Sequence, residues 1–208
     1  MNKYCLYYFP PKTEENLSDS LFVYFGGNLS TKSQEQGEVV SKLYNGDTLI
    51  GYSIHHFSNY IKVRMAGPLY LPNDEVIDII NNILNNVGLD SLPYFDHSGF
   101  VVGEVKNKKE LKKSYLYEID INRMINVEST FELNNGEKVV IALNGTYLVP
   151  GMMVNPFEIE KGVNSDGRIC SNQDLNIEPL DELFMVIVDD KAKNGEDFFK
   201  VERRESDA

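Results

Sequence analysis

The sequence predicts an α+β fold, in which a small N-terminal α/β domain is followed by a β-barrel. One clear amphipathic helical pattern occurs, in the first half of the chain, and the second half shows short strand patterns separated by turn residues. A chain of 208 residues is long enough for two domains of ordinary size. We expect an N-terminal domain at residues 1–91, a linker at 92–99, a barrel at 100–190 and a charged tail at 191–208.

The first half combines apolar strand patterns with one helix. The strands are expected at Tyr4–Phe9, Leu21–Phe25, Val39–Tyr44 and Leu49–Ile54. The last two are joined through Asn45-Gly46, a strong hairpin signal because both residue types tolerate positive φ. Asn73 is a good N-cap, and the apolar residues that follow it recur at spacings of three and four until Gly88. These signals predict a sheet with one helix packed on it.

The second half contains no long helical pattern. Strands are expected at Phe100–Val105, Tyr115–Ile121, Met124–Leu133, Lys138–Leu143 and Val154–Ile159. Asn- and Gly-containing turns separate several of them. Several short strands with turns between them are typical of a small barrel or sandwich.

Composition excludes several classes of protein. Apolar residues make up 42% and charged residues 25% of the chain, which are ordinary values for a globular protein. No apolar run reaches the roughly 18 residues that span a bilayer, and the N-terminus lacks the pattern of a signal peptide. Two cysteines, Cys5 and Cys170, are too few for a disulfide framework, so we expect a cytoplasmic protein with no membrane partner.

The net charge of −12 argues against broad, non-specific nucleic-acid binding, and no DNA partner is expected. The basic residues are unevenly distributed, however. Residues 99–180 hold nine basic and twelve acidic groups, and five of those nine basic groups lie between Lys106 and Lys113. The position of the charge therefore matters more than its total.

The sequence offers no catalytic or metal-binding motif. His55, His56 and His97 lack companion ligands at metal-binding spacing, and neighbouring histidines in a strand point to opposite faces. No phosphate-binding loop, nucleophile elbow or dinucleotide fingerprint occurs. We expect a protein that is not an enzyme and has no cofactor and no metal.

The 38 residues Lys138–Leu175 resemble the second half of the tRNA-binding domain family, which is an OB-fold barrel. The matching positions are Gly145, Pro150, Gly151, Gly162, Val163, Ser165, Gly167, Ile169, Cys170, Ser171 and Leu175, with Asp174 at the family's acidic position. Arg168 replaces the usual Met. The segments Lys108–Leu116 and Glu128–Glu132 depart from the motifs that this family carries there.

The first half also resembles a known family. Asp47–Ile54 followed by Ser58-Asn59-Tyr60 is similar to a stretch in the N-terminal domain of the YtpR family. Those bacterial proteins join a small α/β domain to a tRNA-binding barrel. The resemblance implies a non-catalytic binder of tRNA or another structured RNA, and it implies pairing into a homodimer.

The candidate RNA-binding residues are Lys108, Lys109, Lys112, Lys113, Lys161, Ser165, Arg168 and Ser171. The lysines near 106–113 are expected in the first inter-strand connection, where they either grip phosphates or form a solvated charged loop. Arg168 either pairs with a phosphate, stacks on a base or is simply exposed. The two serines either donate to phosphate or satisfy turns. Tyr115, Tyr117 and Phe131 are stacking platforms or core residues.

Two alternatives stay open. The acidic balance and the two departures from the family motifs also fit a protein–protein interaction module whose barrel has lost RNA binding. A third interpretation is an accessory factor to an aminoacyl-tRNA synthetase.

Overall fold

The computed structural model describes residues 4–11, 18–63 and 66–200, which form two compact units. One unit contains the described residues up to 96 together with 149–153. The other contains residues 97–148 and 154–200. The ends of the expected N-terminal domain and tail, residues 1–3 and 201–208, lie outside the described residues.

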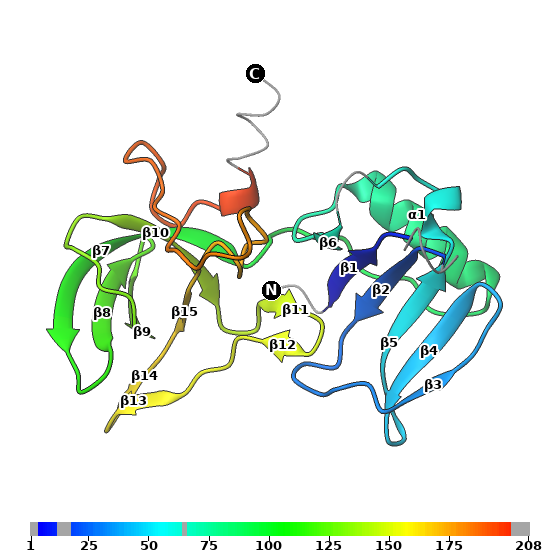
Figure 1. Cartoon of the computed structure of the whole chain (residues 1–208), viewed down its shortest axis with the longest axis horizontal. Helices are drawn as coiled ribbons and strands as arrows, with labels where there is room; N and C mark the ends of the chain where they lie inside the picture. The colour runs from blue at the N-terminus through cyan, green and yellow to red at the C-terminus, as the bar shows by residue number, and fades with distance from the viewer. Residues whose placement is uncertain (1–3, 12–17, 64–65, 201–208) are drawn as a thin grey trace. The chain divides into compact units, whose positions relative to one another are not determined.

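The expected α+β class is wrong, because the described chain is mostly β (Figure 1). The described residues form fifteen strands beside an α-helix of thirteen residues. An α/β domain would need helices that connect parallel strands. In the N-terminal unit the strands pair antiparallel instead, and the helix follows the sheet rather than alternating with its strands.

The N-terminal unit is built on a six-stranded sheet of order β3-β4-β5-β2-β1-β6. Its strands are β1 (Cys5–Phe9), β2 (Ser20–Tyr24), β3 (Ser33–Glu35), β4 (Val40–Asn45), β5 (Thr48–His55) and β6 (Gly67–Pro68). The expected hairpin joins β4 to β5: Asn45 pairs with Thr48, and Gly46 takes a φ of 60° between them. A short 3-10 helix, η1 (Phe57–Asn59), follows β5.

Helix α1 (Asp74–Asn86) forms where the sequence predicts it. The Asn73 side chain accepts a hydrogen bond from the Val76 amide at 3.1 Å, and Gly88 follows the helix with a φ of 75°. Ile77, Ile80, Ile83 and Leu84 are buried against apolar side chains of the sheet. Burial of this one apolar stripe attaches the helix to the sheet.

The second unit is a nearly closed barrel of order β15-β10-β7-β8-β9. Its strands are β7 (Phe100–Glu110), β8 (Tyr115–Asp120), β9 (Met124–Ser129), β10 (Lys138–Leu143) and β15 (Gly167–Ile169). The two outer strands meet near Asp166, whose amide donates to the Asn126 carbonyl at 2.8 Å. The Asn126 amide donates in turn to Asp166 Oδ2 at 3.0 Å. Inward-facing residues of all five strands form one apolar core.

Short hairpins occupy the connection between β10 and β15. They are made by β11 (Tyr147–Val149) with β12 (Met152–Met153), and by β13 (Glu158–Glu160) with β14 (Val163–Asn164). The expected continuous strand at 154–159 is therefore reduced to its last part. Gly167 lets β15 approach β10 closely, because a Cβ atom there would lie 2.6 Å from the Ala142 carbonyl oxygen.

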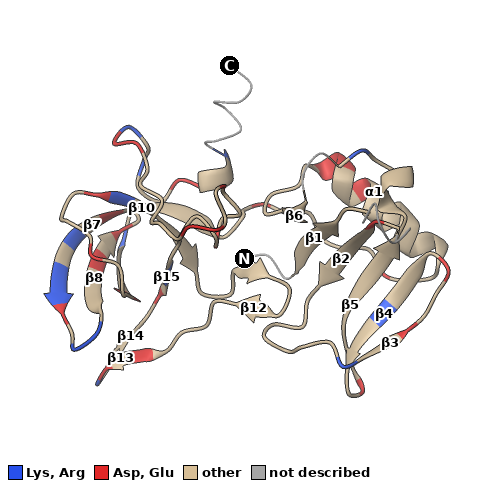
Figure 2. Cartoon of the chain, in the orientation of Figure 1, with Lys and Arg blue, Asp and Glu red and all other residues tan. Residues whose placement is uncertain are grey.

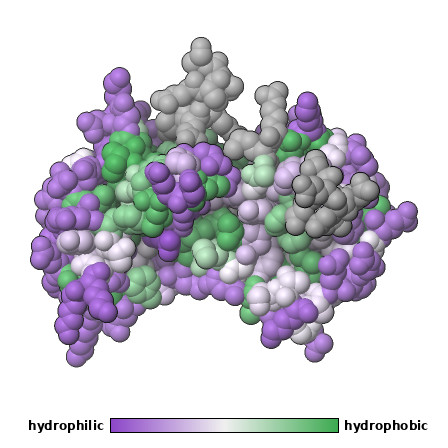
Figure 3. All heavy atoms as spheres, viewed as in Figure 1, coloured by the Kyte–Doolittle hydropathy of each residue, from purple (hydrophilic) through white to green (hydrophobic). Residues whose placement is uncertain are grey.

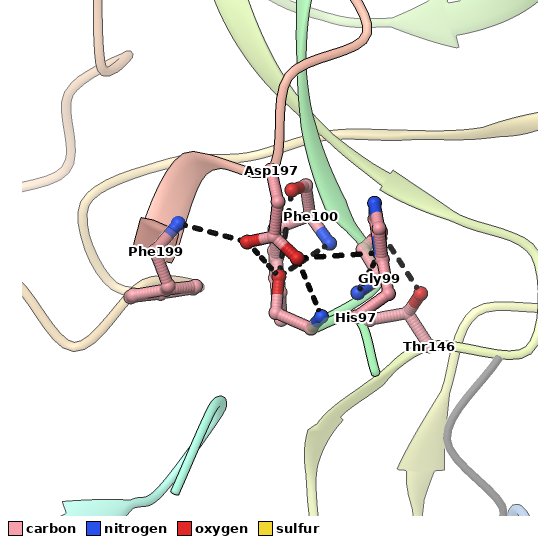
Figure 4. A network of polar contacts seen from close by, with 7 residues as sticks. His97, Gly99, Phe100, Thr146, Asp197 and Phe199 are labelled. Carbon is pink, nitrogen blue, oxygen red and sulfur yellow. Dashed lines mark hydrogen bonds and ion pairs between the residues drawn. The ribbon is translucent and has the colours of Figure 1, made fainter. Parts of the chain in front are cut away.

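The start of β7 is held by a buried carboxylate from the C-terminal segment (Figure 4). Asp197 is 5% exposed; its carboxylate accepts from the Ser98 amide at 2.7 Å and the Ser98 hydroxyl at 2.8 Å. It also accepts from the Phe199 amide at 3.1 Å. The segment 191–200, assigned to the charged tail from its composition, thus contributes a buried contact to the barrel unit.

Candidate nucleic-acid interface

An open pocket of about 210 Å³ lies on the barrel. Its lining comes from three separate parts of the chain: the turn before β8, the end of β9 with the residues after it, and β15. The lining residues are Ser114, Glu128, Ser129, Thr130, Phe131, Arg168 and Ile169. The pocket therefore joins Arg168, a sequence-predicted site residue, to the Glu128–Glu132 segment that departs from the family motif.

Arg168 enters this pocket on β15 with its guanidinium held at two points. Its Nε donates to Asp174 Oδ2 at 3.2 Å, and its Nη2 lies 3.1 Å from Asp174 Oδ1. The Arg168 side chain is 54% exposed whereas that of Asp174 is 10% exposed. A guanidinium group held in this way loses little conformational freedom when it binds a ligand, because its orientation is already set.

The part of the pocket lining at residues 128–131 is fixed by hydrogen bonds that involve the backbone. The Tyr117 hydroxyl donates to the Phe131 carbonyl at 2.8 Å and accepts from the Leu133 amide at 2.9 Å. The Phe131 amide donates to Ser129 Oγ at 3.2 Å. Burial raises the pKa of Tyr117, so its hydroxyl keeps its proton. Ser114 Oγ donates to Glu128 Oε1 within the pocket itself.

The lysines expected in the first inter-strand connection are divided between strand and turn. Strand β7 continues to Glu110, so Lys108 and Lys109 lie on it and only Lys112 and Lys113 lie in the turn before β8. Lys108 Nζ is 3.0 Å from Glu132 Oε1, and this contact raises its pKa. Lys109 Nζ is 2.6 Å from Glu160 Oε2. Figure 2 shows the basic end of β7 beside the neighbouring strand β8, which carries an acidic residue.

Lys112, Lys113 and Lys161 are exposed and form no ion pair within the described residues. Lys161 lies in the turn between β13 and β14. Their charges are uncompensated by a direct partner, which leaves them available to phosphate groups.

The two predicted serines are buried. Ser165 is 1% exposed and its hydroxyl donates to the Gly167 carbonyl at 2.8 Å. Ser171 is 3% exposed; its amide and hydroxyl both donate to Asp174 Oδ2, at 2.9 and 3.0 Å. Ser171 therefore helps to position the carboxylate that holds Arg168, and neither serine presents its hydroxyl to solvent.

Among the aromatic candidates, the described contacts separate core from surface. Tyr117 is fully buried, and Tyr115 packs at the edge of the core with Lys108 Nζ 5.3 Å from the centre of its ring. Phe131 is the aromatic candidate that lines the pocket.

Cys170 is fully buried, and burial raises its pKa, as expected of a core thiol.

Asn172 is a structural residue that the sequence did not single out. Its fully buried side chain donates to the carbonyls of Ile177, Pro179 and Glu182 and accepts from the Phe184 amide. A polar residue between two motif positions, Ser171 and Asp174, carries no local signal of this role. It fixes the path of the loop at residues 177–184.

Within the described residues, no three His, Cys, Asp or Glu side chains converge on a possible metal position. In the same part of the chain, no helix combines the length and the apolar character that crossing a bilayer requires.

The strand order and the position of the pocket are consistent with an OB-type barrel, whose second and third strands and adjoining loops bind oligonucleotides in many proteins. No family model matches the chain. The chain is 29% identical, over 180 residues, to "Putative tRNA-binding protein YtpR" of Bacillus subtilis (strain 168), covering 79% of this chain and 85% of that relative. The resemblance predicted from the sequence is confirmed: the chain is YtpR-like and has diverged.

Proposed function

We propose that this protein binds tRNA through its barrel and catalyses no reaction. The similarity to a relative whose name describes tRNA binding supports this class of partner. The proposal concerns this chain's own residues: Arg168 makes contact at the pocket, and Lys112, Lys113 and Lys161 contact phosphates around it.

The observation that carries the proposal is the arrangement of Arg168. Its guanidinium is held by Asp174 at an open pocket, although more than half of the side chain remains exposed. A guanidinium group that a nearly buried carboxylate holds at a pocket is well placed to recognise a planar or anionic group. On an OB-type barrel, such a position suits single-stranded segments of RNA.

The electrostatics allow only modest affinity. Lys108 and Lys109 each form an ion pair with a glutamate. Only some of the proposed basic residues therefore carry a charge that no acidic side chain already neutralises. Uncompensated cations contribute most to phosphate binding, since the release of counterions from RNA depends on them. Binding should therefore be detectable at low salt and weaken steeply as salt rises.

The test is a titration of labelled tRNA with the full chain at two salt concentrations. We expect Arg168→Glu and Lys112→Glu to abolish binding, while Lys191→Glu, the same change at an exposed lysine that is distant in sequence from every lining residue, leaves more affinity. Absence of binding at low salt would overturn the proposal.

That negative result would favour the second candidate, a protein–protein interaction module. The ion pairs of Lys108 and Lys109 and the net charge of −12 are the observations on its side. If tRNA binds only when an aminoacyl-tRNA synthetase is present, the accessory-factor interpretation would replace both.

We also propose that two copies pair and that the protein works in the cytoplasm. Hydrophobic residues reach the surface of the barrel unit (Figure 3), and the exposed ones include Leu180, Leu183, Phe184 and Ile187. Sedimentation of the wild type and of Leu183→Asp tests the pairing, since loss of a dimer is expected only in the variant. The two free, buried cysteines suit a reducing compartment.

A further inference from the structure

We propose that the pocket binds the Watson–Crick edge of one unpaired guanine in RNA, with Glu128 as the residue that selects it. This inference rests on the proposed function and specifies which base of the RNA the pocket recognises. It begins from the two opposite charges that line the pocket, Glu128 and Arg168.

The charge balance of the pocket disfavours a phosphate inside it. Asp174 pairs with Arg168 directly, and Glu128 contributes a carboxylate to the pocket lining. The lining carries one positive charge, on Arg168, and one negative charge, on Glu128, and Asp174 outside the lining already neutralises Arg168. A phosphate would be repelled by Glu128, whereas a neutral base that offers N–H groups would be attracted. Phosphate contacts would instead fall to the exposed lysines around the pocket.

Guanine suits this donor and acceptor pattern. Its Watson–Crick edge presents one acceptor, O6, beside two adjacent donors, N1–H and the N2 amino group. A carboxylate accepts from both donors at once, and an arginine donates to O6. Adenine, cytosine and uracil each lack a pair of adjacent donors on that edge. Glu128 and Arg168 therefore match guanine with three hydrogen bonds and the other bases with fewer.

The pocket is also organised before binding. Ser114 fixes Glu128 through Oε1, and no described residue is bonded to Oε2. Tyr117 fixes the backbone on both sides of Glu132, which keeps Phe131 on the pocket wall. Proteins usually hold an extruded RNA base by stacking it on an aromatic side chain while polar groups form hydrogen bonds with the edge of the base. The volume of about 210 Å³ suits one base rather than a base pair.

The experiment compares full-length protein binding to fluorescent RNA pentamers that differ only in the central base of UUXUU, where X is guanine, inosine, adenine or uracil. We expect the guanine pentamer to bind about tenfold more tightly than the adenine and uracil pentamers, as for other bidentate base contacts. Inosine lacks the N2 amino group and should fall between them.

The variant Glu128→Gln should keep the same fold and lose the preference for guanine, so that the ratio of its affinities for the guanine and uracil pentamers falls to about one. Glu182→Gln serves as the matched control, because it removes one negative charge from an exposed position outside the pocket lining. A wild-type protein that binds all four pentamers equally, or a guanine preference unchanged in Glu128→Gln, would overturn the inference.

Intact tRNA separates the two proposals. If tRNA binds with the expected salt dependence but the pentamers show no guanine preference or do not bind, the base-reading pocket is wrong and the proposed function stands. If neither tRNA nor any pentamer binds, the proposed function fails and the inference fails with it.

Discussion

Asp174 holds Arg168 through both of its carboxylate oxygens, with contacts of 3.2 and 3.1 Å to Nε and Nη2. The same carboxylate accepts two hydrogen bonds from Ser171. One nearly buried acidic residue thus links the turn after β15 to the most accessible charged group of the pocket. The orientation of Arg168 is therefore a property of the fold and not only of its own side chain.

Replacement of Asp174 by Ala should destabilise the barrel unit. It leaves the buried Ser171 amide and hydroxyl without their acceptor, at a cost of about 1–3 kcal/mol. The measurement is the free energy of unfolding in urea. Asp181→Ala, at an exposed position with no described side-chain contact, is the control and should change it by less than about 0.5 kcal/mol. Equal effects of the two variants would contradict the role given to Asp174.

Lysines with and without ion-pair partners should differ in their contribution to RNA binding. Lys112→Ala removes an uncompensated charge and should reduce the slope of log affinity against log salt by about one. Lys108→Ala should reduce it less, because Glu132 already neutralises that ammonium group. Titrations of tRNA at several salt concentrations measure both slopes, and a larger effect at Lys108 would show that its ion pair opens on binding.

Replacement of Asp197 by Ala should weaken the whole barrel unit. It leaves the buried donors of Ser98 and the Phe199 amide without their charged acceptor, which should cost about 2–3 kcal/mol. Thermal or urea unfolding measures the loss. Asp190→Ala, at an exposed aspartate directly before the segment 191–200, should leave stability almost unchanged. If both variants unfold like the wild type, the contact at the start of β7 does not stabilise the barrel.

The two thiols should make the protein less stable at alkaline pH. Burial raises the pKa of Cys5 to about 12 and raises that of Cys170 as well, above their ordinary value of 9.0. Between pH 9 and 10 the unfolded thiols release protons while the folded ones retain them. Stability should therefore fall as pH rises, by up to about 1.4 kcal/mol per pH unit for each thiol.

The free energy of unfolding across pH 8–10 measures this fall, and Cys170→Ala should make it shallower. An identical pH dependence in that variant would contradict the prediction. As a second readout, a thiol reagent should modify the denatured protein much faster than the native one.

Local signals predicted the local features well. Helix α1 begins after Asn73 and ends before Gly88, as the capping preferences of these two residues predict. Asn45-Gly46 predicted the hairpin between β4 and β5. The fold class was wrong for a different reason. Whether a helix connects parallel strands or covers an antiparallel sheet depends on strand pairing between distant residues, which periodicity does not report.

The candidate site also combines features that local sequence signals predict with features that depend on contacts between distant residues. Residues 106–110 carry charges rather than alternating apolar side chains, so the sequence favours a loop there. Pairing with β8, for example Lys109 with Leu116, extends β7 through them. Arg168 was recognised from its place in a motif. Its place in the same pocket as Glu128 depends on the closure of the barrel, which no spacing in the sequence indicates.

Asn172 holds the loop at 177–184 through main-chain atoms alone. Carbonyl and amide groups are the same whatever side chain a residue carries. Side chains of that loop other than Glu178, whose Oε2 accepts from the Leu180 amide, can therefore change over evolution without removing the contacts that Asn172 makes. A loop of constant shape and variable surface can acquire new binding partners while the barrel beneath it stays the same.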